Sequence, residues 1–389
     1  MFSARLPSAL APNALATAVA AHRAAGRPVL DLTQTNPTEV GLSYPPDVLR
    51  SLGDEAGVRY RPDPRGLADA RAAVAERYAP GATVDPEAVL LTCSTSEAYG
   101  LIFKLLCDPD TDVLVPQPSY PLFDLLTRLE GVAPRAYRLE YDGRWTIDRA
   151  SLEQAAGERT RAVLVVSPNN PTGSWLREDD REWLVALARR RGFAIVSDEV
   201  FADYPLSVRP GACSLAAERR ALTFVLGGLS KSAGLPQVKL GWIAASGPDA
   251  LVHEAMARLE VISDTYLSVS TPVQLAARRL MADGAAIRRA IHARVRHNLD
   301  RLREEASRYP AVALLEPEGG WSAVVRVPAT ITEEAMVLGA LDQADVLVHP
   351  GFFFDFPQEA YLAMSLLPEP GTFSEAVRRL LAFVAGAAA

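Results

Sequence analysis

Lysine is scarce in this sequence, and basic clusters are absent. Of 40 basic residues only three are lysines: Lys104, Lys231 and Lys239. The formal net charge is −7. Nucleic acids and anionic membranes attract basic surfaces, so neither is an expected partner. The arginine-rich stretch "ARRRG" (188–192) instead indicates the end of a helix, where cations favour the negative terminus and glycine stops the helix.

Cysteine and histidine are also few. The three cysteines, Cys93, Cys107 and Cys213, form no CxxC pair, and their odd number and long spacing argue against a disulfide framework. The five histidines are scattered, so no metal site is predicted. A reducing compartment fits this usage.

Long apolar runs are absent, since none approaches the ~20 residues needed to span a bilayer. The first 26 residues, with an early arginine and small-residue triplets, faintly resemble a secretory signal. However, Pro12 and Asn13 interrupt the apolar run, and a helix beginning near Pro12 is the favoured interpretation. We therefore predict a cytoplasmic protein.

The middle of the chain alternates short β-rich runs with helical patterns. Continuous apolar strands separated by helices indicate a mainly parallel sheet buried on both faces, hence an α/β fold. The last two strands are joined without a clear helix, so one of them is expected to be antiparallel. Expected strands are 88–92, 112–116, 162–167, 193–198, 222–228 and 240–246, and expected helices are 96–107, 119–130 and 178–191.

The length of 389 residues predicts two domains. After residue 249 the pattern becomes strongly helical (249–262 and 272–307) and closes with strands at 321–327 and 361–366 and a helix at 373–385. We predict a large domain of residues 45–265. A smaller α+β domain would combine residues 1–44 with residues 266–389.

Five successive strand ends carry polar or aromatic residues, and in such sheets chemistry gathers at the carboxyl ends of strands. The first strand runs into Ser94, Thr95 and Ser96 before a helix, which suits an anion site. Alone, these residues would more often be a helix cap. Tyr120 follows the second strand and could cover a flat ligand, although packing alone is the commoner role.

The third strand ends in "SPNNPTG", where prolines and a glycine fix a turn around Asn169 and Asn170. A rigid asparagine can bind a ligand oxygen or cap its own backbone. The fourth strand ends at Asp198. A carboxylate there is costly without a cationic partner, which could be a protonated ring nitrogen or an arginine.

The fifth strand leads into "LSKSAGLPQVKLGW", which places Lys231 among small and apolar residues. Desolvation lowers the pKa of a lysine and makes its amine a nucleophile able to form a Schiff base, which an arginine cannot do. A lone lysine is normally a surface residue. Together, however, the five strand ends supply a phosphate cradle, a ring cover, a hydroxyl partner, a ring-nitrogen partner and an amine, as pyridoxal 5′-phosphate requires.

In this order the motifs identify a family resemblance over nearly the whole chain. "SPNNPTG", then "SDEV", then "SK" with a basic residue eight positions later resembles the class I/II aminotransferases of the fold-type I pyridoxal-phosphate enzymes. That resemblance implies a mainly parallel sheet between helices plus a smaller α+β domain. It also implies that Lys231 forms the internal aldimine and transfers protons, and that Asp198 keeps the ring nitrogen protonated.

The resemblance assigns the other contacts as well. Asn170 would bind the ring hydroxyl and Tyr120 would stack on the ring. Tyr60 would reach a phosphate in a neighbouring subunit, which implies a homodimer with shared active sites. The phosphate would be bound by Ser94, Thr95, Ser96, Ser230 and Lys239.

Several positions depart from the family pattern. Lys239 stands where an arginine is usual, Phe201 where a tyrosine is usual, and Gly228 where a serine is frequent. The largest departure is Ala363 in "YLAMS", where the family pattern "YLRLS" has an arginine that grips the substrate carboxylate. Either another residue supplies that charge or the substrate lacks an α-carboxylate. Predicted substrate contacts are Asn36, Arg65 and Arg326.

The sequence thus predicts an enzyme that transfers an amino group between a small-molecule amino donor and a keto acid. Elimination, decarboxylation or oxidation on the same cofactor is the alternative, which Ala363 makes more credible. A regulator that kept the cofactor site is a third hypothesis. It is disfavoured because only 44 residues, not basic ones, precede the large domain.

Overall fold

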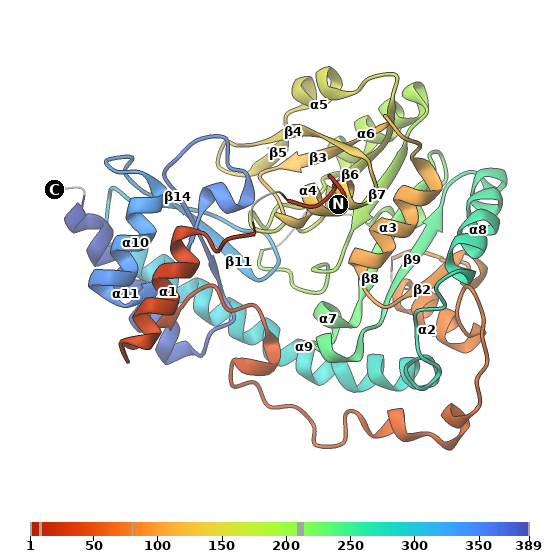
Figure 1. Ribbon diagram of the computed structural model, residues 1–389, viewed down its shortest axis with the longest axis horizontal. Helices are drawn as coiled ribbons and strands as arrows, with labels where there is room; N and C mark the ends of the chain where they lie inside the picture. Colours follow the sequence, from red (N-terminus) through yellow and green to blue (C-terminus); the bar gives the residue numbers. More distant parts are fainter. Residues whose placement is uncertain (1, 8–9, 80, 208–213, 388–389) are drawn as a thin grey trace.

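An eight-stranded sheet forms the larger part of the protein (Figure 1). In this computed structural model, residues 2–7, 10–79, 81–207 and 214–387 are described; Cys213 lies outside them. The strand order is β2-β9-β8-β7-β6-β3-β4-β5. The strands are β2 (Val89–Thr92), β3 (Asp112–Gln117), β4 (Ala133–Tyr141), β5 (Trp145–Ile147), β6 (Thr160–Val166), β7 (Ala194–Asp198), β8 (Thr223–Gly228) and β9 (Gly241–Ser246).

The sheet is mainly parallel, as predicted. Strands β4, β3, β6, β7 and β8 pair in parallel, whereas β9 runs antiparallel to both β8 and β2. The expectation that one of the last two strands is antiparallel is therefore confirmed for β9. Because β2 and β8 both oppose β9, the carboxyl ends of β2, β3, β6, β7 and β8 share one edge of the sheet.

Helices cover both faces of this sheet. Alternate residues along each strand enter opposite cores; for example, Val163 faces one and Leu164 the other. Helix α6 shows the expected end signals: acidic residues fill its first turn, arginines fill its last, and Gly192 closes it with a φ of 74°. The flanking helices are α2 (Ala68–Tyr78), α3 (Thr95–Leu106), α4 (Leu122–Leu129), α5 (Arg149–Ala155), α6 (Glu178–Arg191) and α8 (Asp249–Asp264).

A smaller part is built on a four-stranded antiparallel sheet of order β10-β11-β14-β13. The long helix α9 (Thr271–Ala306) runs beneath both parts (Figure 1). We call the two parts the large-sheet part (residues 89–264) and the small-sheet part (residues 14–35 and 313–387). The remaining elements are α1 (Ala14–Ala24), β1 (Leu30–Asp31), β10 (Ala313–Leu315), β11 (Ser322–Arg326), α10 (Glu333–Ala344), β12 (Val346–Leu347), β13 (His349–Pro350), β14 (Tyr361–Ser365) and α11 (Pro370–Ala387).

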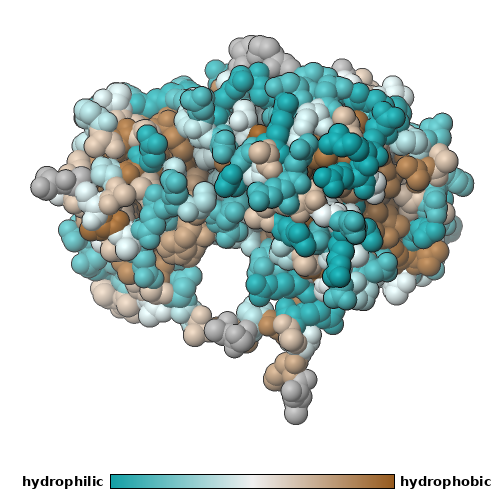
Figure 2. Space-filling model, turned by 90° about the horizontal axis from the view of Figure 1, so that it is seen from above, coloured by the Kyte–Doolittle hydropathy of each residue, from teal (hydrophilic) through white to brown (hydrophobic). Residues whose placement is uncertain are grey.

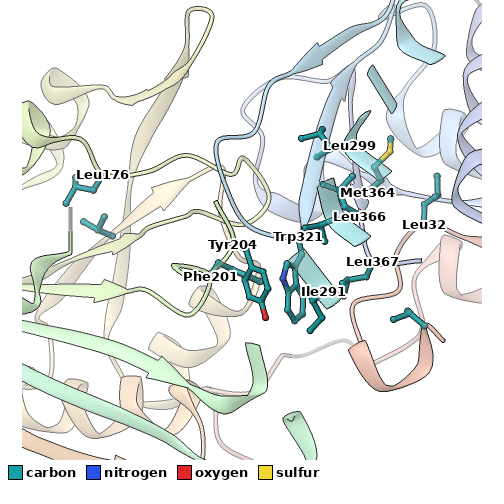
Figure 3. Close-up of a cluster of buried hydrophobic side chains, with 14 of the residues drawn as sticks. Leu32, Leu176, Phe201, Tyr204, Ile291, Leu299, Trp321, Met364, Leu366 and Leu367 are labelled. Carbon is teal, nitrogen blue, oxygen red and sulfur yellow. The ribbon is translucent and has the colours of Figure 1, made fainter. Parts of the chain in front are cut away.

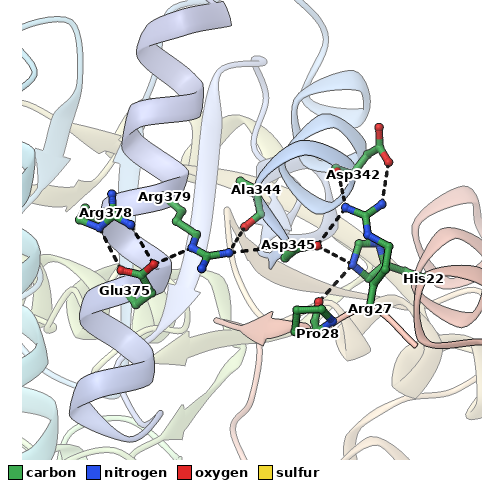
Figure 4. Close-up of polar contacts among 9 residues, drawn as sticks. All are labelled: His22, Arg27, Pro28, Asp342, Ala344, Asp345, Glu375, Arg378 and Arg379. Atoms are coloured by element: carbon green, nitrogen blue, oxygen red, sulfur yellow. Dashed lines mark hydrogen bonds and ion pairs between the residues drawn. The ribbon is translucent and has the colours of Figure 1, made fainter. Parts of the chain in front are cut away.

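Asp345 ties three segments of the small-sheet part together (Figure 4). It follows α10 and accepts hydrogen bonds at Oδ1 from His22 of α1, at 3.0 Å, and from Arg27, at 2.9 Å. Arg379 of α11 lies 3.5 Å from its other oxygen. Strand β1 also pairs in parallel with β12, so the N-terminal segment packs against the C-terminal part of the chain.

The face seen in Figure 2 is largely hydrophilic, with smaller hydrophobic patches among the polar residues. Among the described residues, no helix is both long enough and apolar enough to cross a membrane.

Candidate active site

The shared strand edge and the small-sheet part enclose a cavity of about 230 Å³. The predicted residues that line it are Ser94, Thr95, Ser96, Tyr120, Asn170, Asp198, Ser230 and Lys231. They follow β2, β3, β6, β7 and β8, so the sheet edge brings them together although the sequence separates them by up to 137 positions. From the other side the cavity is closed by Thr35, Trp321 and Ser322.

Asp198 is a buried carboxylate at the end of β7, with an exposed fraction of 8%. Its Oδ2 accepts a hydrogen bond from the Tyr99 hydroxyl, and its Oδ1 accepts one from the Val200 amide, both at 3.1 Å. Burial raises the pKa of Asp198 to about 6, although both hydrogen bonds and the charge of Lys231 act in the opposite direction. Among the described residues it forms no ion pair within 4.0 Å, so a cation bound in the cavity would supply the missing partner of this buried carboxylate.

Lys231 contributes the amine. Its Nζ lies 5.0 Å from the ring centroid of Trp321 and 5.7 Å from that of Phe201. The backbone is held by the Tyr204 hydroxyl, which donates to the Lys231 carbonyl oxygen at 2.5 Å. Burial lowers the pKa of Lys231 to about 8, against the opposing effect of Asp198. A substantial fraction of this amine is therefore neutral near physiological pH.

Trp321 lies where the two parts meet (Figure 3). Phe201 and Tyr204 of the large-sheet part stand on one side of its ring, and Leu366 and Leu367 of the small-sheet part on the other. Its ring meets those of Phe201 and Tyr204 edge to face, with centroids 5.4 and 5.1 Å away. These contacts fix the aromatic face that Lys231 touches.

The start of α3 holds the three residues predicted to bind an anion. Ser94 serves as the helix cap, because its Oγ accepts a hydrogen bond from the Glu97 amide at 3.1 Å. Thr95 and Ser96 occupy the first turn and line the cavity. Gly241 of β9 passes closely behind the cradle: a Cβ there would lie 3.0 Å from the Ser94 backbone.

The two asparagines of "SPNNPTG" have different tasks. Asn169 is the turn residue: it accepts from the Ser119 hydroxyl at 2.6 Å and donates to the Thr172 hydroxyl at 2.9 Å. Asn170 lines the cavity, and its Oδ1 accepts from the Ser322 hydroxyl at 3.1 Å. That bond leaves the Asn170 amide nitrogen available to a ligand.

Tyr120 lines the cavity with 40% of its surface exposed. Its ring meets Phe123 edge to face, with centroids 6.3 Å apart, and Phe123 meets Tyr99 in the same way at 5.4 Å. The aromatic row therefore links the predicted ring cover to the tyrosine that binds Asp198.

Other predicted site residues lie outside this cavity. Lys239 is exposed, and Tyr60, with 75% of its surface exposed, lines a separate hollow of about 340 Å³. Asn36 accepts hydrogen bonds from the amide and hydroxyl of Thr38, as a helix cap does. Its neighbour Thr35 lines the cavity instead.

The two predicted substrate arginines also lie elsewhere. Arg65 donates to Glu260 Oε2 at 2.6 Å and borders a different hollow, at the side of α8. Arg326 is exposed at the end of β11, four residues beyond Ser322. Since a strand advances about 3.3 Å per residue, the backbones of these two residues lie roughly 13 Å apart.

The sequence did not single out Thr35, Phe123 or Ser322. Thr35 precedes Asn36, and Ser322 follows Trp321 at the start of an expected strand, so neither residue carries the strand-end signal used for the large sheet. Their positions depend on how the small-sheet part packs against the large-sheet part, which the local sequence does not reveal.

The residues fit pyridoxal 5′-phosphate. A buried carboxylate with no ion-pair partner among the described residues suits a protonated ring nitrogen, and the α3 terminus suits a phosphate. An amine with a lowered pKa suits an aldehyde, and Asn170 has a free donor for a ring hydroxyl. All four groups line one cavity.

Comparison with known proteins gives a consistent result. Residues 27–380 match the family model described as aminotransferase class I and II. The chain is 28% identical to alanine aminotransferase of Mycobacterium tuberculosis over 372 residues, covering 92% of this chain and 86% of that protein. It is 25% identical to glutamate-pyruvate aminotransferase AlaA of Escherichia coli over 375 residues, covering 93% and 91%.

A solved structure is similar over the same length. The alanine aminotransferase of Pyrococcus furiosus superposes with a TM-score of 0.87 at 25% identity, and the match covers 95% of both chains. The fold of this chain, with its large sheet and small antiparallel sheet, is thus shared with that solved structure.

Proposed function

The chain belongs to the class I and II aminotransferase family, and we propose that Lys231 is the catalytic amine of its transfer reaction. It is a pyridoxal-phosphate-dependent aminotransferase, as its family and its full-length relatives indicate. The observation that carries the proposal is that the Lys231 amine and the buried Asp198 carboxylate line the same cavity.

Bound there, pyridoxal phosphate supplies an aldehyde that bonds to amines and a protonated ring that withdraws electrons. Asp198 would hold the proton on the ring nitrogen, and Asn170 would donate to the ring hydroxyl. Tyr120 would cover one face of the ring. The phosphate would be held by Ser94, Thr95, Ser96 and Ser230.

Lys231 would first hold the aldehyde and then serve as the base. With a pKa of about 8, its Nζ can exist as a neutral amine at physiological pH and accept a proton from the α-carbon of the amino donor. Trp321 and Phe201 limit where Nζ can move, because their rings border it. The same amine can return a proton when a keto acid is the acceptor.

We also propose a homodimer that shares its active sites, in the cytoplasm. Tyr60 is largely exposed, as is Val58 two residues before it, and Tyr60 lines the same hollow as Leu267. A second copy that covers this surface could bring Tyr60, and with it a phosphate contact, to the neighbouring site. The division into residues 45–265, and 1–44 with 266–389, is likewise a proposal.

Elimination, decarboxylation and oxidation are not favoured, because the relatives matching over nine-tenths of the chain are named as aminotransferases. The test is a product balance. The purified protein, loaded with cofactor, is incubated with amino donors and a keto acid. Transfer predicts one keto product and one new amino acid per turnover, whereas ammonia or carbon dioxide released in proportion to donor consumed would contradict it.

A further inference from the structure

The two walls of the cavity differ in charge. The large-sheet wall carries the residues that suit the cofactor, including the carboxylate of Asp198. The small-sheet wall consists of Thr35, Trp321 and Ser322, which are neutral. Among the described lining residues, Lys231 is the sole cation, and the proposed function commits it to the cofactor.

Strands β11 and β14 show what lies beside Ser322 in the neutral wall. Ser322 and Val324 are two residues apart in β11, so their side chains lie on the same face of the sheet. Val324 pairs with Ala363 of β14. Ala363 is 1% exposed and belongs to an apolar cluster with Val324 and two phenylalanines. Ala363 is therefore packed among apolar side chains and is not among the described residues that line the cavity.

Aromatic rings from both parts seal this cluster. Trp145, on β5 of the large sheet, meets Phe356 edge to face with centroids 6.1 Å apart. Phe356 stacks on Tyr361 of β14, with centroids 4.5 Å apart and an interplanar angle of 26°. The hydroxyl of Tyr141, which borders Trp145, accepts from the Glu316 amide at 3.2 Å. An arginine at 363 would thus have to displace a packed interface.

Three arginines of the surrounding elements either bind other residues or lie away from the cavity. Arg65 binds Glu260, and Arg326 lies at the far end of β11. Arg294 of α9 donates to the carbonyl oxygens of Val40 and Leu367, at 2.9 and 3.1 Å. The polar side chains that the small-sheet part does present to the cavity are the hydroxyls of Thr35 and Ser322.

A carboxylate that leaves water is held best by a cation or several strong donors, whereas a neutral amide or alcohol is satisfied by hydroxyl groups. We propose, on the basis of the proposed function, that Thr35 and Ser322 determine specificity by receiving a neutral hydrogen-bonding group of the amino donor. The preferred donors are then amines that bear a carboxamide or hydroxymethyl group in place of a free α-carboxylate.

The test uses the cofactor-loaded enzyme and a panel of amino acids, each paired with its primary amide and its amino alcohol. The half-reaction with the donor is followed by the cofactor spectrum, so no keto acid is required. We expect the best amide to exceed its amino acid about tenfold in kcat/KM, the effect of roughly one lost charge partner. A preference for the free amino acid overturns the inference, and inactivity of every donor contradicts the proposed function instead.

Binding provides a readout that needs no turnover. Calorimetry compares propionate with propionamide, which share their shape and lack the reacting amine. We expect propionamide to bind more tightly, and tighter binding of propionate overturns the inference. Thr35→Val should weaken propionamide binding by about fivefold, the worth of a neutral hydrogen bond, while Thr35→Ser retains it. Equal binding of propionamide to both variants would show that the Thr35 hydroxyl does not contact it.

Discussion

The two walls of the cavity, one from the large-sheet part and one from the small-sheet part, form in different ways. The predicted residues of the large-sheet wall follow strands of the large sheet, and two of them are fixed locally: Asp198 by its hydrogen bond from the Val200 amide, and Asn170 by the turn around it. The small-sheet wall comes from a loop and the start of β11, and nothing but docking of the two parts brings it to the cavity. Accordingly, we expect changes in the first wall to abolish transfer and changes in or behind the second to alter stability and donor choice.

The largest effect should follow Lys231→Ala. Loss of the amine removes both the group that holds the cofactor and the base, so we expect transfer to fall about 10⁴-fold. Single-turnover rates with a good donor measure this. Lys104→Ala is the control, because Lys104 pairs with Glu130 away from the cavity, and it should keep activity within about twofold. Comparable losses in the two variants would contradict the assignment.

Next comes Ala363→Arg, which probes the buried position beside Val324 in the small sheet. An unpaired charge inside the apolar cluster should lower the free energy of unfolding by about 3–5 kcal/mol. Urea unfolding of the cofactor-free protein checks this, with Ala363→Val as the size control, expected to cost about 1–3 kcal/mol. A stable Ala363→Arg variant that gains activity toward free amino acids would show that the position is open to substrate.

Asp198→Asn tests the large-sheet wall without changing its shape. The amide keeps the size of the carboxylate but cannot stabilise a protonated ring nitrogen. We expect kcat to fall about 10²-fold, roughly 2.7 kcal/mol, with a smaller loss of cofactor affinity. Rapid-mixing kinetics and cofactor titration separate the two quantities. Unchanged kcat would mean that Asp198 serves packing alone.

The smallest effect should come from Tyr99→Phe, which removes a hydrogen bond one step behind the cavity. Transfer should fall about fivefold. Since that bond lowers the pKa of Asp198, its removal should raise this pKa above about 6, and the acid side of the activity profile should move to higher pH. A titration of the Asp198 carboxyl by carbon NMR in the cofactor-free protein checks the direction. An unshifted pKa would mean that Tyr99 has only a packing role.

In the cofactor-free protein, Asp198 and Lys231 also make stability depend on pH. The pKa of Asp198 is raised in the folded state, so its contribution to stability is lost as pH rises from about 4 to about 6. The pKa of Lys231 is lowered to about 8, so stability recovers above that pH as the unfolded state binds more protons. Between about pH 6 and about pH 8, both Asp198 and Lys231 are charged and buried in the folded protein, which lowers its stability. Bound cofactor would offset this cost by pairing with both groups.

Sequence reasoning located the large-sheet wall because its signals are local. An apolar run followed by Asp198, Asn170 or Lys231 indicates both a buried strand and the residue at which it ends. Because the strands are parallel, their carboxyl ends then lie at the same edge of the sheet. It did not place Arg65 or Arg326, whose positions depend on their partners and on the register of β11 with β14. Strands β4 and β5 were also missed: Tyr137 is the one buried residue of β4, so this strand lacks the continuous apolar run of the inner strands.

The most direct test of the central claim is to identify the amine that holds the cofactor. The loaded enzyme is reduced with borohydride, digested and mapped by mass spectrometry, and the chain offers just three lysines for comparison. The account predicts a single reduced adduct on Lys231, absent from Lys231→Ala. An adduct on Lys104 or Lys239, or a cofactor that dissociates unmodified after reduction, would contradict it.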